Sequence, residues 1–402
     1  MNTTENNILI LNGGSSSIKF ALFAAAPKLR IKMQGQIERI GTPAAMLSTQ
    51  EGEHEAHVTR PVAAADYASA VKLLIGWIDQ KDIDDTLIAV GHRIVHVGAN
   101  FHQLQRLTSK LTAELQQLAP LDSQHMPGEI SLADAFQQRF PKVPQIACFD
   151  TAFHHDLPRF ARMLPIPRRY EAQGVRRYGF HGPSYEFLMN ELNHVDGVAA
   201  ARGRSILAHL GNDASLAAVS GGKPVDTSMG FTPTAGVLMG TRSGDLDPGL
   251  VEYLARTEKI DAKAFDEMVN FKSGLLGVSE TSADMRDLLK IEADDARAAD
   301  AIALFCYQVK KTIGAYAAAM GGLDRLVFSG GIGEKAPVVR ARICDELGFL
   351  GIELDAARNE KDANLISADG GRVKMRVIRT NEELVIARSV CNVLGFNDMP
   401  PQ

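Results

Sequence analysis

The chain has 402 residues, 45% of them hydrophobic and 23% charged, and its net charge at pH 7 is −5. This length favours two domains, and the composition is ordinary for a globular protein. A mildly acidic chain has no general attraction for nucleic acid or for an anionic membrane, so neither is expected as a partner.

The N-terminal part predicts strands followed by helices. An apolar run from Ile8 to Leu11 meets a turn at residues 12–17, and apolar residues then alternate from 18 to 22, which predicts two strands joined by a turn. Asp66 precedes an apolar helical face and predicts a helix N-cap. Short buried strands are expected at 88–90 and 146–149, and Pro127 suits the first turn of a helix that ends near residue 140.

The second half repeats part of this pattern. Residues 206–219 form another apolar–turn–apolar unit about 200 residues after the first, which favours two related halves. The stretch 221–249 is rich in Gly, Pro, Ser and Thr, shows no clear helix and is long enough to indicate a functional loop. A helix is expected over 296–320, followed by a strand at 326–328, a tight loop at 329–333 and a helix from Pro337.

The last helix is expected to begin near Thr380. Thr380 and Glu383 have the spacing of a capping box, which accounts for Glu383 but leaves Glu382 free for another role. Because strands alternate with helices along the chain, the sequence predicts an α/β architecture.

Two turns have the composition of a phosphate-binding site. Residues 12–19, Asn-Gly-Gly-Ser-Ser-Ser-Ile-Lys, offer backbone N–H groups, hydroxyls and a lysine, and their glycines allow close approach. Residues 329–334, Ser-Gly-Gly-Ile-Gly-Glu, join a strand to a helix, where a nucleotide can meet a helix N-terminus. Taken alone, the first is better explained as a glycine-serine hairpin turn, and the second could equally be a structural turn between strand and helix. The chain has neither a Walker P-loop nor a G-x-G-x-x-G fingerprint.

Two arginines stand in unusual surroundings. Arg93 lies at the end of an apolar strand, where an unpaired charge is costly, so it is either a ligand-binding residue or half of a buried ion pair. Arg242 lies among glycines and acids in residues 239–247. Its planar guanidinium suits a phosphate, although a solvated arginine on a turn would have the same sequence.

Residues 148–156 gather possible metal ligands. Asp150 closes a strand, a favoured position for a catalytic residue, whereas His154, His155 and Asp156 lack the i, i+4 spacing of helical zinc ligands. A zinc hydrolase stays open as a minor alternative.

The cysteines and the N-terminus indicate a compartment. The four cysteines are far apart and form no C-x-x-C pair, which argues against a disulfide framework or a zinc finger. The first residues lack the pattern of a signal peptide, and no apolar run is long enough to span a bilayer. We therefore expect a cytoplasmic protein.

Taken together, the segments resemble the acetate kinase family of the actin, Hsp70 and sugar-kinase superfamily. The resemblance covers nearly the whole chain in the same order, through residues 12–19, 91–96, 149–154, 178–182, 209–212, 226–233, 239–248, 282–287, 330–334 and 380–383. It implies two duplicated actin-like (ribonuclease H-like) α/β domains with a cleft between them. One would contain residues 1–150 and the C-terminal helix 384–402, and the other residues 151–383.

The resemblance also implies a reaction. Family members transfer the γ-phosphoryl group of ATP directly and in line to acetate, which gives acetyl phosphate and ADP reversibly, with Mg²⁺ (or Mn²⁺) as the cofactor. Such transfer depends on positioning and on charge neutralisation. The implied catalytic residues are Arg93, Asp150, His181 and Arg242, and the implied metal-positioning residues are Asn12 and Glu382. The implied nucleotide-binding residues are Ser15, Ser17, Lys19, His209, Leu210, Gly211, Asn212, Asp284, Met285, Arg286, Gly331, Ile332 and Gly333.

By family position, the wall around the alkyl end of the acid beside Arg93 consists of Val95, Leu121, Phe180 and Pro233. A short acid buries little area, so we expect modest discrimination by size. Acetate is the expected substrate, with propionate or a longer short-chain acid as the alternative and a non-metabolic ATPase switch as a remote one. The family also implies a homodimer.

Three positions depart from the family pattern. Asp122 stands where a histidine is common, three residues before His125, which could take over that role. An acid there would repel a substrate carboxylate unless it points away. Asp213 replaces a glycine after Asn212 in the expected phosphate loop, and Val97 interrupts a His-Gly-Gly run.

Overall fold

The computed structural model describes residues 5–14, 16–25, 28–52, 55–98, 101, 103–122 and 125–395. The chain divides into two compact units, which we call unit 1 (residues 1–152 and 381–402) and unit 2 (residues 153–380). Within the ranges given, no helix combines the length and the apolar character needed to cross a bilayer.

Unit 1 is built on an eight-stranded sheet with the strand order β5-β4-β3-β2-β1-β6-β8-β7. Strands β1 to β5 pair with one another in antiparallel fashion, whereas β6 is parallel to both β1 and β8. The strands are β1 (Asn7–Gly13), β2 (Ile18–Ala24), β3 (Arg30–Glu38), β4 (Met46–Glu51), β5 (Val58–Pro61), β6 (Leu87–Ile94), β7 (Gln105–Arg106) and β8 (Gln145–Phe149). The helices are α1 (Tyr67–Asp79), α2 (Ser109–Leu118), α3 (Met126–Arg139) and α16 (Glu382–Val393), with a 3₁₀ turn at Ala119–Leu121.

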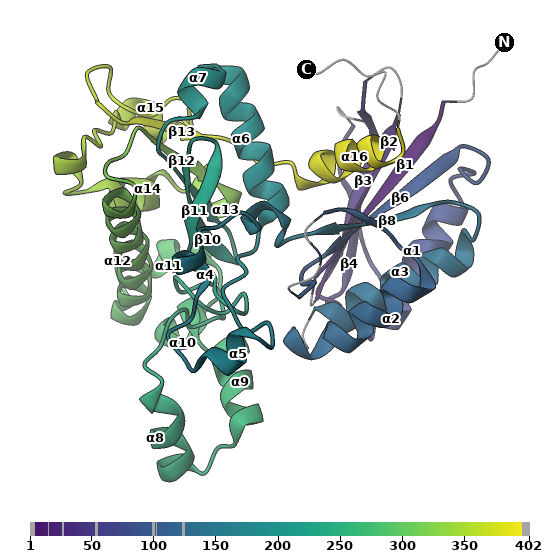
Figure 1. The fold of residues 1–402 in the computed structure, drawn as a ribbon, viewed down its shortest axis with the longest axis horizontal. Helices are drawn as coiled ribbons and strands as arrows, with labels where there is room; N and C mark the ends of the chain where they lie inside the picture. Colours follow the sequence, from purple (N-terminus) through teal and green to yellow (C-terminus); the bar gives the residue numbers. More distant parts are fainter. Residues whose placement is uncertain are drawn as a thin grey trace. The chain divides into compact units, whose positions relative to one another are not determined.

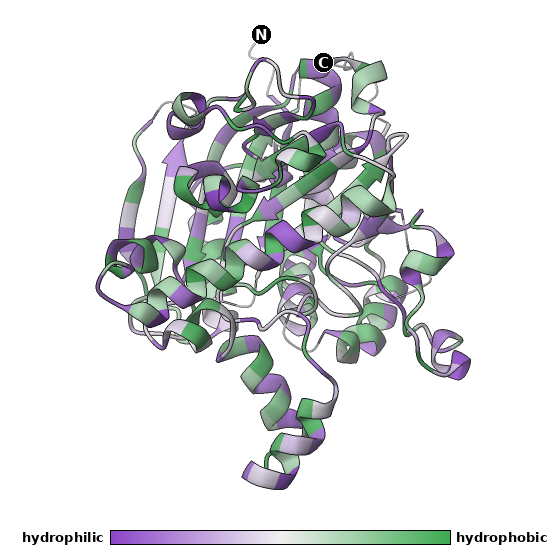
Figure 2. Ribbon diagram, turned by 90° about the vertical axis from the view of Figure 1, so that its left-hand side faces the viewer, coloured by the Kyte–Doolittle hydropathy of each residue, from purple (hydrophilic) through white to green (hydrophobic). Residues whose placement is uncertain are grey.

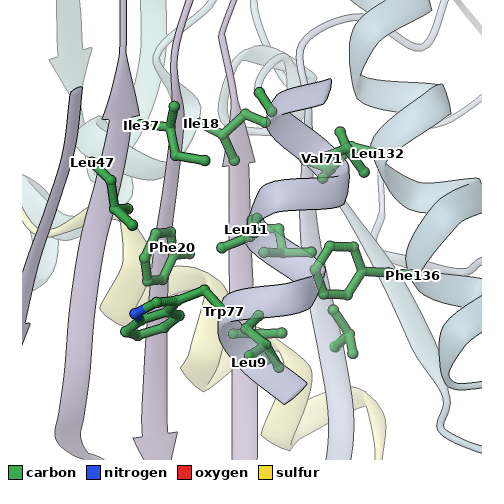
Figure 3. Close-up of a cluster of buried hydrophobic side chains, with 14 of the residues drawn as sticks. Leu9, Leu11, Ile18, Phe20, Ile37, Leu47, Val71, Trp77, Leu132 and Phe136 are labelled. Atoms are coloured by element: carbon green, nitrogen blue, oxygen red, sulfur yellow. The ribbon is translucent and has the colours of Figure 1, made fainter. Parts of the chain in front are cut away.

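Both faces of this sheet are covered, because its strands alternate two apolar sets. Leu9, Leu11 and Phe20 face α1 and α3, where Trp77 and Phe136 complete the core (Figure 3). The alternate residues of the same strands, such as Ile8, Ile10 and Ala21, pack on the opposite face against α16, which lies beside β1 and β2 in Figure 1. The C-terminal helix therefore belongs to the core of the N-terminal strands. Along the helices in Figure 2, hydrophobic and hydrophilic residues alternate, as expected of helices with one buried face.

Unit 2 has a five-stranded sheet with the order β11-β10-β9-β12-β13. Helix α6 packs on it through Tyr185, Leu188 and Leu192, and the long helix α12 contacts β9 and β10. The strands are β9 (Ser205–Leu210), β10 (Ala214–Ser220), β11 (Lys223–Thr227), β12 (Arg325–Ser329) and β13 (Lys374–Val377). The helices are α4 (Arg159–Arg162), α5 (Arg168–Glu171), α6 (Gly182–Asp196), α7 (Val198–Ala201), α8 (Gly249–Glu258), α9 (Ala262–Phe271), α10 (Gly274–Ser279), α11 (Met285–Ile291), α12 (Ala296–Ala319), α13 (Gly330–Lys335), α14 (Pro337–Cys344) and α15 (Ala356–Glu360). Two 3₁₀ turns lie at Ala152–His154, which begins in unit 1, and at Gly348–Leu350.

The two sheets share one arrangement of strands. In unit 1 the order β3-β2-β1-β6-β8 combines an antiparallel meander with two parallel neighbours, and β11-β10-β9-β12-β13 repeats it in unit 2. This repetition confirms the predicted α/β fold with two related halves.

Three local predictions were wrong. The expected tight loop at 329–333 is instead the first turn of α13, within which the Glu334 carboxylate accepts the Gly330 N–H (3.0 Å). The long loop 221–249 begins with a strand, β11. The cap of α16 is Asn381, whose side chain accepts the Leu384 N–H (2.9 Å), so Thr380 and Glu383 form no capping box.

Candidate active site

A row of polar residues crosses the sheet of unit 1 near the ends of β1 and β6. The strand register places Lys19 opposite Asn12, and Asn12 opposite Arg93. Asp150 directly follows β8, the next strand along the sheet. Because β1, β6 and β8 are parallel, their carboxyl ends meet at one edge of the sheet, the usual place for ligand binding in an α/β fold.

Arg93 is held firmly in this row. Its Nε donates to Asp150 Oδ1 (2.8 Å) and its Nη2 donates to Oδ2 (2.6 Å), while Nη1 donates to Asn12 Oδ1 (3.2 Å). Burial opposes the charge on Arg93, but the attraction of Asp150, Glu382 and Glu129 outweighs it and raises the pKa above its ordinary value. The buried ion pair expected as one reading of Arg93 is therefore present, and a fixed cation lies at the sheet edge.

The same edge gathers oxygen ligands. Asn12 Nδ2 donates to Glu382 Oε2 (3.4 Å), and Glu382 lies in the first turn of α16. Magnesium prefers amide and carboxylate oxygens and usually keeps several waters, so Asn12, Asp150 and Glu382 fit a hydrated Mg²⁺. In the described ranges, no three His, Cys, Asp or Glu side chains lie close enough together to bind a metal ion directly.

The expected phosphate-binding turn is only partly described. Ser15 lies outside the described residues. The Gly14 N–H donates to the Ser17 carbonyl (2.7 Å) across the turn, Ser17 is half-buried and Lys19 is exposed.

The acid-side residues of unit 1 follow β6. Val95 is buried, and Leu121 is half-buried at the end of the 3₁₀ turn. Asp122 is turned toward His125: its Oδ1 accepts the His125 backbone N–H (3.1 Å) and lies 2.9 Å from His125 Nδ1. Both side chains are buried. The acid that stands at position 122 in place of the family's histidine is therefore paired with His125.

Glu129, in the first turn of α3, was not among the residues predicted for the site. Its Oε2 accepts the backbone N–H of Val95 (2.8 Å), and its side chain is buried. In the sequence it has the ordinary pattern of an acid near a helix N-terminus, and nothing there indicates the long-range contact.

In unit 2 the corresponding row is Ser215, His209 and Ser329. His181 Nδ1 and Ser215 Oγ lie 2.8 Å apart, and the rings of His181 and His209 lie 4.3 Å apart. Ser184 Oγ lies 2.8 Å from His209 Nδ1 and 2.9 Å from Thr380 Oγ1. The structure thus brings His181 and His209 together and adds two serines that sequence reasoning missed.

The backbone of His181 is constrained as well. It precedes α6 with a φ of 61°, a left-handed conformation that few residues other than glycine adopt. Such conformations persist where the surroundings enforce them, and they gather at functional sites.

Arg242 lies on the loop that follows β11. Its Nη1 is 2.8 Å from Asp213 Oδ1, so the acid that departs from the family pattern pairs with this arginine. The Gly240 N–H donates to the Asn212 carbonyl (2.8 Å), which ties the loop to the β9–β10 turn. Gly274, with a φ of 63°, lies so close to the Arg242 backbone that a Cβ there would clash.

The expected nucleotide segments adjoin this loop. Gly211 follows Leu210 at the end of β9 and approaches Gly331 at the start of α13, which also contains Ile332 and Gly333. Asp284 caps α11 by accepting the Arg286 N–H (2.9 Å) and forms an ion pair with the exposed Arg286 side chain. Met285 is buried, so its side chain has little surface left for contact with an adenosine.

The acid-side residues of unit 2 lie on two segments joined by hydrogen bonds. The Tyr178 and Gly179 N–H groups donate to the Gly230 carbonyl (2.9 and 3.4 Å), shortly before Phe180 and Pro233, both of which are buried. These bonds hold the two apolar segments side by side.

The side chains considered for zinc have different partners. His154 Nε2 lies 3.0 Å from the Phe180 carbonyl, Asp156 pairs with Lys223 (3.3 Å), and Asp150 binds Arg93. The residues therefore do not favour the hydrolase alternative.

Comparison with known proteins decides the family. A model of the acetokinase family matches residues 7–388. The chain belongs to the acetokinase family. It is 44% identical to a propionate kinase of Citrobacter rodentium (strain ICC168), over 97% of each chain. It is 43% identical to an acetate kinase of Rhodopseudomonas palustris (strain ATCC BAA-98 / CGA009), over 95% of this chain and 97% of the relative.

A solved structure of an acetate kinase has the same fold as this chain. Porphyromonas gingivalis acetate kinase superposes with a TM-score of 0.86 at 36% identity, covering 97% of this chain and 100% of that one. The fold is therefore the duplicated actin-like α/β fold of the acetate kinases. As a member of this family the chain is a carboxylate kinase, and the family uses ATP and ADP and generally depends on Mg²⁺.

Proposed function

We propose that this carboxylate kinase transfers the γ-phosphoryl group of ATP directly and reversibly to acetate, giving acetyl phosphate and ADP. The observation that carries the proposal is Arg93, a largely buried guanidinium fixed by Asp150 beside the oxygens of Asn12 and Glu382. A cation fixed next to magnesium-type ligands suits a reaction between two anions. Propionate is the second candidate, because relatives of similar identity carry both names.

The roles in unit 1 follow from these contacts. Arg93 binds the acid carboxylate and an oxygen of the transferred phosphoryl group, and Asp150 keeps its fork in place. Asn12, Glu382 and Asp150 hold Mg²⁺ mostly through waters, and that ion neutralises phosphate charge when bound. Val95 and Leu121 form part of the wall around the acid.

The roles in unit 2 follow in the same way. Arg242 stabilises the equatorial phosphoryl oxygens, and His181, oriented by Ser215, donates a hydrogen bond there. Phe180 and Pro233 complete the apolar wall. The nucleotide contacts come from His209, Leu210, Gly211, Asn212, Asp284, Met285, Arg286, Gly331, Ile332 and Gly333, together with Ser15, Ser17 and Lys19 of unit 1.

A trap for acyl phosphate tests the proposal. The enzyme is incubated with ATP, Mg²⁺, hydroxylamine and one acid at a time, from formate to butyrate, and hydroxamate is measured. We expect the highest kcat/KM with acetate and a smaller value with propionate. A higher value with propionate would reassign the substrate, and hydroxamate from none of the acids would overturn carboxylate phosphorylation in favour of an ATPase switch.

A further inference from the structure

Glu129 is a buried acid in contact with the strand end that carries Arg93. Its side chain is 2% exposed, and one carboxylate oxygen accepts the Val95 N–H. Among the described residues, its other oxygen has no hydrogen-bond partner, and neither has the buried hydroxyl of Tyr67. A Cβ built on Gly13 would clash with that hydroxyl and approach Glu129 Cγ to 3.4 Å, so both groups lie against the end of β1.

The charges around Glu129 come from several elements. Arg93 on β6 attracts its carboxylate, whereas Asp122 before α3 and Asp150 after β8 repel it, and Tyr67 on α1 faces it as a neutral phenol. Burial, more than these two acids, raises the pKa of Glu129 to about 8, while Arg93 and the Val95 N–H act in the opposite direction. A neutral carboxyl can still accept the Val95 N–H, and it adds no negative charge beside a carboxylate substrate.

The position of Val95 gives this contact its consequence. Val95 lies two residues after Arg93, in the bend that directly follows β6. A hydrogen bond to the Val95 N–H therefore fixes the strand end that presents both the cation and the apolar wall. Nothing else in the described structure accepts from that N–H.

We propose that Glu129 is a positioning residue that fixes Val95 through the bond to its N–H, and thereby sets both the affinity for the acid and the preference between acetate and propionate. Glu129 does this as a neutral carboxyl group. This inference rests on the proposed function, in which Arg93 and Val95 contact the acid. It assigns no contact between Glu129 and the substrate.

Two substitutions separate positioning from charge. Glu129→Gln keeps an acceptor for the Val95 N–H and copies the neutral carboxyl, whereas Glu129→Leu removes the acceptor at similar volume. Glu114→Gln, at a partly exposed acid on α2, is the matched control. For each protein, kcat and the KM values for acetate, propionate and ATP are measured between pH 6 and pH 9, with circular dichroism to verify folding.

We expect Glu129→Leu to raise the KM for acetate about tenfold, the effect of one buried hydrogen bond, and to change the acetate-to-propionate ratio while the KM for ATP stays constant. Glu129→Gln should restore wild-type KM values. For the wild type we expect kcat/KM for the acid to fall as pH rises through about 8, the pKa of Glu129, and Glu129→Gln should remove this fall.

Other outcomes overturn the inference. An unchanged KM for acetate in a folded Glu129→Leu protein would contradict it. An equal impairment of kcat and of the KM values for acetate, propionate and ATP would contradict it as well. If the leucine variant does not fold, the pH profiles decide, and identical profiles for the wild type and Glu129→Gln would refute the role. A wild-type enzyme that phosphorylates no acid would refute the proposed function instead, before any variant is compared.

Discussion

The two sheets repeat one strand order but carry different chemistry in the same row. In unit 1 the row is Lys19, Asn12 and Arg93, whereas in unit 2 it is Ser215, His209 and Ser329. Unit 1 thus places its arginine on a strand, and unit 2 supplies Arg242 from a loop. The scaffold was duplicated, and its residues then diverged.

The two arginines are also held differently. Arg93 forms a bidentate pair with Asp150, whose side chain is 1% exposed, and it also donates to Asn12. Arg242 pairs with Asp213, whose side chain is 40% exposed. A buried partner fixes a cation permanently, whereas a hydrated partner can give way to a substrate anion at little cost. We infer that Arg93 is part of a fixed frame and that Arg242 exchanges Asp213 for phosphate.

The largest effect is expected from removing the exchangeable arginine. Arg242→Ala should lower kcat by about 10² to 10³, because the lost interaction is strongest as charge develops in the transition state. The KM for ATP should change little. Steady-state kinetics measures both values, with Arg256→Ala, an exposed arginine paired with Glu252, as the control. An unchanged kcat would remove Arg242 from the catalytic residues.

The fixed arginine predicts a loss of stability instead. Asp150→Ala leaves the largely buried Arg93 without its main partner and should lower the free energy of unfolding of unit 1 by about 3 kcal/mol. The single tryptophan, Trp77, lies in the core of unit 1, so its fluorescence during urea unfolding reports on that unit. Arg242→Ala should leave the same transition unchanged, and a shift there would blur the distinction between the two arginines.

A scan of pH should also distinguish unit 1. Glu129 has its pKa raised from 4.5 to about 8, so over that interval the folded state binds a proton that the unfolded state has lost. Stability should therefore fall as pH rises between these values, by at most about 1.4 kcal/mol per pH unit. Trp77 fluorescence in urea at several pH values measures the slope, and Glu129→Gln should make it shallower. Equal slopes would mean that Glu129 is ionised in the folded protein at neutral pH.

Much of this frame is predictable from the sequence, for identifiable reasons. The strand–turn–strand units, the helix at Pro127 and the last helix depend on local periodicity, so apolar spacing and capping residues reveal them. Arg93 and Asp150 can be recognised in the sequence because each stands at the end of an apolar strand.

The pairings were not predictable in the same way. That Glu129 binds Val95 and that Asp213 binds Arg242 both depend on contacts between segments far apart in the sequence. Such contacts are set by the register of the sheets and by helix placement, which residue spacing alone does not encode.

The smallest expected effect tests the exchange at Arg242 itself. Asp213→Asn keeps the shape of the side chain but removes the charge that competes with phosphate. Because the pair is partly exposed, the KM for acetyl phosphate should fall by no more than about fivefold, with kcat nearly constant. Added salt should narrow the difference from the wild type, since it screens the pair. Asp287→Asn, at an exposed acid on α11, is the control. A rise in KM would mean instead that Asp213 orients Arg242 as Asp150 orients Arg93, and both arginines would then belong to the fixed frame.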